Sequence, residues 1–206
     1  MKRLTCVVVC LHIAISLCLA QALPSRTTRN QQIQATRLHF QGDYEGAAAL
    51  LEECVSKIDR ECGPFSEHSG RALLSLGWSQ MMSDKASAAE RSFKRSLHIA
   101  EKRDGKDSGS CVGALRALGM LYEKQRKWQE AAKAYDRCVN SLYETDIHSL
   151  PTLAEILERY ADVLRKIPAK ESWFGVAEGR KRPRAEMLEK RAKHIRKKIK
   201  AQRSTR

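Results

Sequence analysis

Small and apolar residues between Leu115 and Cys138 recur at the spacing of two α-helices. They fall at i, i+3, i+4 and i+7 in the first half and at i, i+4 and i+7 in the second, so each set occupies one helical face. These positions are Leu115, Leu118, Gly119 and Tyr122, followed by Ala131, Tyr135 and Cys138. A short polar turn separates the two sets. The pattern predicts a helical hairpin in which Gly119 and Ala131 let the two backbones approach closely.

The same pattern returns every 42 residues, which indicates a repeat architecture. Four units share the period, although the first is degenerate in its leading helix. The matching positions are Leu73, Leu76, Gly77, Ala89 and Phe93 in the second unit, Leu157, Tyr160, Ala161 and Leu164 in the fourth, and Ala35, Leu38, Tyr44, Ala47, Leu51 and Cys54 in the first. The helices expected from the pattern cover residues 27–41, 44–60, 66–82, 86–103, 110–125, 128–143 and 150–166.

The fourth unit departs from this pattern at Pro168, because proline cannot continue a helix. We expect a loop or insertion over residues 168–183, a delayed helix over 184–201 and a flexible tail over 202–206. The delayed helix has one narrow apolar stripe and an otherwise charged surface, which is typical of a capping element. The stripe consists of Leu188, Ala192, Ile195 and Ile199.

The third unit resembles the tetratricopeptide repeat family, on the Leu-Gly-Tyr and Ala-Tyr-Cys positions quoted above. The 42-residue period is similar to that of the kinesin-light-chain type. The resemblance covers roughly residues 30 to 200 and implies an all-α fold: a right-handed superhelical array of about four helix-turn-helix repeats over residues 23–167. It also implies that the first helix of each repeat lines a concave surface that binds partners.

The N-terminal residues 1–22 have a different character. Lys2 and Arg3 precede an apolar run, and Ala20-Gln21-Ala22 places small residues where a signal peptidase cleaves. This predicts a secretory signal peptide, cleavage after Ala22, and a periplasmic or extracellular protein. The alternative is an uncleaved membrane anchor, since the run of about 17 residues is near the lower limit for spanning a bilayer.

Three of the seven cysteines would leave with this leader, and four remain: Cys54, Cys62, Cys111 and Cys138. An exported chain could pair them, and Cys62–Cys111 is the favoured bridge. For Cys54 and Cys138 we favour simple packing as small apolar residues. Because the chain has no C-x-x-C motif and no histidine at ligand spacing from a cysteine, we expect no metal site.

Charge is concentrated at the C-terminus. The chain of 206 residues has a formal net charge of +14. Residues 180–206 contain 13 basic and two acidic residues and therefore supply most of this charge. This basic surface could bind a polyanion or an anionic membrane surface, while the missing aromatic residues argue against single-stranded nucleic acid. The alternative is a solvated face of the capping helix. Its candidate residues are Arg180, Lys181, Arg182, Arg184, Lys193, Arg196, Lys197 and Lys198.

Catalytic and cofactor motifs are absent from the sequence, including the nucleophile elbow, the zinc-protease motif and Gly-rich phosphate loops. We therefore expect a binding protein with no cofactor, and not an enzyme. The family resemblance places six residues in the concave groove: Arg71, Trp78, Met82, Arg116, Met120 and Arg159. Such a groove would take a peptide with apolar anchors and some acidic residues. The alternative is that Trp78 and the methionines belong to the core. The sequence leaves the oligomeric state open.

Overall fold

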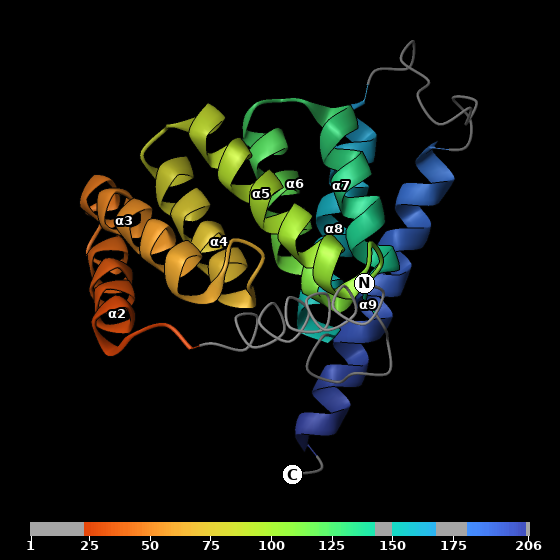
Figure 1. Ribbon diagram of the computed structural model, residues 1–206. Helices are drawn as coiled ribbons and strands as arrows, with labels where there is room; N and C mark the ends of the chain where they lie inside the picture. The colour runs from red at the N-terminus through yellow and green to blue at the C-terminus, as the bar shows by residue number, and fades with distance from the viewer. Residues whose placement is uncertain (1–22, 143–149, 168–180, 205–206) are drawn as a thin grey trace, which may run out of the picture. The chain divides into compact units, whose positions relative to one another are not determined.

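The computed structural model describes residues 23–142, 150–167 and 181–204 (Figure 1). Within these residues every regular element is a helix. The chain divides into two compact units at Arg103 and Asp104, which we call the N-terminal lobe and the C-terminal lobe and describe separately. The expected leader, residues 1–22, and most of the expected loop, residues 168–180, lie outside the described residues. No helix in the described part of the chain is long and apolar enough to span a bilayer.

The N-terminal lobe contains two helical hairpins: α2 (Arg26–Phe40) with α3 (Tyr44–Cys62), and α4 (Glu67–Met82) with α5 (Ala86–Asp104). Helix α3 packs against both α2 and α4. Three of these helices begin at side chains suited to capping, because Ser25, Asp43 and Ser66 each accept a hydrogen bond from the backbone amide three residues later. The helix bounds agree with the sequence prediction to within two residues.

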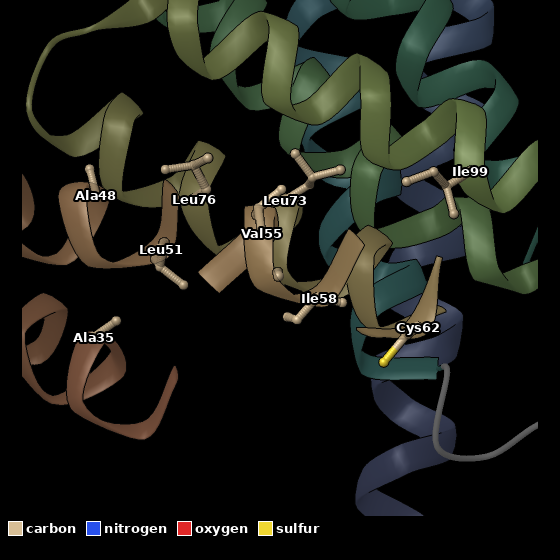
Figure 2. Packing of buried hydrophobic residues seen from close by; sticks show 10 residues of the cluster. Ala35, Ala48, Leu51, Val55, Ile58, Cys62, Leu73, Leu76 and Ile99 are labelled. Carbon is tan, nitrogen blue, oxygen red and sulfur yellow. The ribbon is translucent and has the colours of Figure 1, made fainter. Parts of the chain in front are cut away.

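The core of this lobe is drawn from all four helices (Figure 2). Ala35 comes from α2, and Ile99 comes from α5. The cluster contains Ala35, Ala48, Leu51, Val55, Ile58, Cys62, Ala72, Leu73, Leu76 and Ile99, with Leu50 packed against it. Because one cluster joins the two hairpins, each hairpin buries its apolar face against the other.

The C-terminal lobe begins with a short 3-10 helix, η1 (Gly109–Cys111), which leads into α6 (Val112–Lys124). The expected single helix over 110–125 is therefore two elements. Helix α7 (Trp128–Asn140) pairs with α6, and α8 (Leu150–Lys166) packs against both α7 and α9 (Lys181–Ser204). The expected end of α7 at residue 143 was wrong by three residues.

Helix α9 differs from its predicted bounds at both ends. It starts at Lys181, three residues before the expected start, and continues to Ser204, so that residues 202–204 are helical and not a flexible tail. Pro183 lies in the first turn, where a helix needs no amide donor and tolerates proline. Three residues of the expected apolar stripe, Leu188, Ala192 and Ile195, are buried, and the fourth, Ile199, is half-buried.

The turn between the two helices of a repeat has the same geometry three times. Gly42, Asp84 and Arg126 stand 42 residues apart and have positive φ angles of 87°, 58° and 59°. In each turn, the amide of the next residue donates to the carbonyl five positions before it, at 3.0, 2.8 and 2.9 Å. This is the hydrogen bond of a Schellman motif, which ends a helix with a left-handed residue. The 42-residue period of the apolar residues is therefore also the interval at which this turn conformation recurs.

An aromatic ring fills the small position in two of the hairpins. A Cβ added to Gly77 would meet the ring of Phe93, and one added to Gly119 would meet the ring of Tyr135. Phe93 and Tyr135 are fully buried. The prediction that Gly119 serves a close backbone approach therefore needs correction, because the space above this glycine holds a side chain from α7.

The four cysteines in the described part of the chain are free and buried. The favoured Cys62–Cys111 bridge is not formed. Cys62 is the last residue of α3 rather than part of a loop, and it packs into the core of the N-terminal lobe. For Cys54 and Cys138, packing as small apolar side chains is the outcome that the sequence favoured.

Candidate functional site

A cavity of about 190 Å³ opens between α2 and α4 in the N-terminal lobe. Its walls come from the first helices of repeats 1 and 2, and α3 contributes one residue. The lining consists of Ala35, Thr36, His39 and Phe40 of α2, Leu51 of α3, and Ser75, Trp78 and Ser79 of α4. A water molecule occupies roughly 30 Å³ of liquid, so this space is large enough for an amino-acid side chain.

Trp78 belongs both to this cavity and to the packing of the second hairpin. Its indole ring is half-buried and lines the cavity. It also stands edge-on to Phe93, with ring centroids 5.5 Å apart and an angle of 69° between the planes. Part of the ring therefore faces the cavity and part packs in the hairpin, while the assignment of Trp78 to a partner-binding groove stays a prediction. Met82, one turn further along α4, is 45% exposed.

The opposite wall is held in place by polar and aromatic contacts of His39. Nδ1 of His39 lies 3.0 Å from Oγ of Ser79, which joins α2 to α4. The imidazole also stands edge-on to Phe40 and Tyr44, with centroids 5.9 and 5.1 Å away. Phe40 is 84% exposed, a high value for so large an apolar side chain. The cavity therefore has a fixed wall and an exposed aromatic rim.

The three predicted groove arginines have different surroundings. Arg71 on α4 has a side chain that is 74% exposed and a 3.7 Å ion pair with Glu67 of the same helix. Arg116, in the C-terminal lobe, lies 3.0 Å from Glu155. Arg159 lies 3.3 Å from the same Glu155 and 3.4 Å from Glu123. Only Arg71 of the three leaves most of its guanidinium to solvent.

Arg116 and Arg159 belong to a chain of alternating charges that also includes Tyr135. The hydroxyl of Tyr135 donates to Glu123 at 2.5 Å. Burial, and then this contact with a carboxylate, raise the pKa of Tyr135 well above its usual range. These contacts link α6, α7 and α8, and they occupy donors that a partner's carboxylate would need. Met120, the remaining groove candidate, is half-buried on α6.

The predicted basic surface divides into paired arginines and exposed lysines. Arg184 contacts Asp136 of α7 at 2.5 Å, and its guanidinium lies over the ring of Tyr160. Arg196 forms two hydrogen bonds of 2.7 Å with Glu158 of α8, which lower the pKa of that carboxyl.

The other members of this surface fall into two groups. The exposed ones are Lys193, Lys197 and Lys198. Arg180 lies outside the described residues, and the side chains of Lys181 and Arg182 are not described. In the described part of the chain, no three His, Cys, Asp or Glu side chains gather as a metal site would need.

Sequence reasoning did not find the α2 wall of the cavity. Thr36 and Phe40 stand 42 residues before Trp78 and Met82, so the repeat period itself points to them. They were missed because the first repeat lacks the signature residues in its leading helix. His39 stands 42 residues before Met81, which is buried and does not line the cavity, so only the contacts of His39 with Ser79 and Tyr44 reveal its role.

Comparison with known proteins confirms the repeat type. Residues 114–146 match the model of the tetratricopeptide repeat family. A crystal structure of BtubC (BKLC) from P. vanneervenii superposes with a TM-score of 0.70 and 19% identity, covering 88% of this chain and 69% of that one. Nearly identical TPR-like repeats of a putative kinesin light chain from Podosopora anserina superpose with a TM-score of 0.57 and 18% identity, covering 89% and 97%. A search of curated proteins gave no match.

The chain therefore has the fold of tetratricopeptide-like helical repeats. One of the two matched structures is that of a putative kinesin light chain, and at these identities the likeness concerns fold alone. Such a fold suggests a scaffold for protein–protein interaction.

Proposed function

We propose that this protein is an interaction scaffold that binds a peptide segment of a partner in the α2–α4 groove. The observation that carries the proposal is the cavity of about 190 Å³ between the first helices of two successive repeats. An apolar side chain of the partner would enter it and contact Trp78 and Phe40. Burying one such side chain contributes roughly 1.5–3 kcal/mol to the free energy of binding. This side chain would anchor a short peptide in the groove.

The charges near the groove favour a partner with an acidic residue. Arg71 lies seven residues before Trp78 on α4, and Arg29 lies seven residues before Thr36 on α2, so each arginine shares a helical stripe with a cavity residue. Both are exposed, and α2 contains no Asp or Glu. Seven residues of helix correspond to about 10 Å. We expect an apolar anchor and an acidic residue about that far apart.

The C-terminal lobe contributes less to this function. The carboxylates of Glu155 and Glu123 already occupy Arg116 and Arg159. A ligand carboxylate would have to displace these contacts. We therefore expect the acidic residue of the partner to bind Arg71 in the N-terminal lobe.

Selection of random peptides displayed on phage, with the purified full-length chain as bait, tests this function. Ser75→Trp places a large ring in the cavity from an exposed position on α4. Ser87→Trp introduces the same ring at an exposed position of α5 outside the lining. We expect selected peptides to contain an apolar anchor and an acidic residue, and to bind Ser75→Trp at least about tenfold more weakly, an effect of roughly 1.4 kcal/mol.

Two results would overturn this assignment. One is the absence of any selected peptide, and the other is equal binding by the Ser75→Trp and Ser87→Trp proteins. Export remains a separate proposal that rests on the sequence of residues 1–22. N-terminal sequencing of the mature protein tests cleavage near Ala22 against an uncleaved anchor.

A further inference from the structure

Helix α9 buries most of its apolar surface inside the C-terminal lobe, although Met187 is exposed. Ala185, Leu188, Ala192 and Ile195 are buried, and the helix packs along α8. An amphipathic helix that inserts into a bilayer needs its apolar face free for the lipid chains. That face is not free here, so α9 cannot insert in this manner without leaving α8.

Ion pairs fix the orientation of α9 about its axis. Arg184 contacts Asp136, and Arg196 contacts Glu158 through two hydrogen bonds. Glu189 completes the set, since it lies 2.5 Å from Arg165 of α8. These contacts, together with the apolar stripe, determine which side of the helix points outward.

Five exposed lysines occupy the outward part of α9: Lys190, Lys193, Lys197, Lys198 and Lys200. Four of them follow i, i+3, i+7 and i+10, a stripe along one side of the helix that does not include the buried Ala192. The stripe is about 15 Å long at 1.5 Å per residue. None of the five forms an ion pair with another described residue, and no acidic residue occurs between Lys190 and Ala201.

We propose that this lysine face docks the protein on anionic lipid headgroups by electrostatic attraction alone. Lysine provides a compact, strongly hydrated positive charge without the planar fork of arginine, so it suits a surface of many loosely ordered anions. The arginines that could bind a phosphate in two-point fashion, Arg184 and Arg196, are held by carboxylates.

The shape and composition of the same face argue against single-stranded nucleic acid. Proteins that bind single strands combine a basic groove with aromatic side chains on which bases stack. The lysines of α9 lie on the exposed surface of one helix and not in a groove, and residues 184–201 contain no Phe, Tyr or Trp. A planar anionic surface is complementary to such a face.

Binding to lipid vesicles tests the proposal. The probes are phosphatidylcholine vesicles with about one third phosphatidylserine, and matched vesicles of phosphatidylcholine alone. The variant combines Lys190→Gln, Lys193→Gln and Lys197→Gln. Each lysine near an anionic membrane contributes about 1 kcal/mol, so the vesicle partition coefficient should fall on the order of 100-fold. High salt should release the wild-type protein completely.

The control carries the same loss of charge at exposed positions outside α9: Arg60→Gln, Arg91→Gln and Lys106→Gln. We expect this protein to bind the anionic vesicles nearly as well as wild type. Equal weakening by both triple variants would show that only net charge matters and would overturn the proposal. So would failure to bind anionic vesicles, binding to an oligonucleotide in their place, or binding that resists high salt.

Discussion

Replacing Gly119 with alanine tests the ring-into-glycine packing of the hairpins. An alanine Cβ would lie 2.5 Å from Cε1 and 2.7 Å from Cζ of Tyr135. Carbon atoms in contact normally stay about 3.5–4.0 Å apart, so the ring would have to move by roughly 1 Å. Tyr135 is fully buried, and its hydroxyl is held by Glu123, so the ring has little room to retreat.

The expected cost follows from two opposing effects. Overpacking a core typically costs about 1–3 kcal/mol. Alanine in a helix interior recovers up to about 1 kcal/mol relative to glycine. Because a 2.5 Å approach to a buried ring belongs in the upper part of the overpacking range, at about 2–3 kcal/mol, a gain of about 1 kcal/mol leaves a net loss. We therefore expect Gly119→Ala to lower the free energy of unfolding by roughly 1–2 kcal/mol, measured by urea denaturation of the full chain with circular dichroism.

Gly70 provides a matched control in another helix. An alanine Cβ at this position would lie 3.4 Å from Cγ2 of Ile99, an ordinary contact distance. Gly70→Ala should therefore leave stability unchanged or raise it by up to about 1 kcal/mol. If Gly119→Ala proves as stable as wild type, the ring of Tyr135 does not constrain this position, and the packing argument is wrong.

Two further predictions concern ionisable groups. The backbone amide of Ser25 donates to Glu61 at 2.8 Å and lowers the pKa of this carboxyl. The resulting stabilisation is complete above the ordinary carboxyl pKa of 4.5 and is lost as pH falls through the lowered value. Urea denaturation across that acid range should therefore be less pH-dependent for Glu61→Gln, and equal slopes would refute this role. Burial raises the pKa of Cys138 to about 12, so peptide mapping after iodoacetamide treatment at neutral pH should find Cys138 labelled only in the unfolded chain.

The fold was largely predictable because the residues that pack within each repeat lie close together in the sequence, at the spacing of a helical face. The apolar period placed the helices up to α8, apart from the 3-10 turn at Gly109–Cys111 and the early end of α7. The left-handed conformation of Asp84 and Arg126 was not predictable from residue type. Glycine at position 42 suggests such a turn, whereas arginine at position 126 disfavours it, and only the repeated backbone geometry reveals it.

The candidate sites were less predictable because they depend on contacts between distant parts of the chain. The family resemblance assigned Arg116 and Arg159 to the groove, but spacing along one helix does not show that Glu155 reaches Arg116 from 39 residues away. For the same reason, the basic helix looked uniform in sequence. The structure separates Arg196, which is held by Glu158, from the exposed lysines.

The left-handed residues at 42, 84 and 126 also determine where this chain tolerates changes in length. A single inserted residue within a repeat would move another side chain into the turn, where most residues with a Cβ are strained. The loop that follows Asp104 has one such residue, Gly105 with a φ of 94°, and residues 106–108 after it have no positive φ before η1 begins at Gly109. Insertions and deletions should therefore survive selection between repeats or as whole 42-residue duplications. Within a repeat, the number of residues before the left-handed position should stay constant.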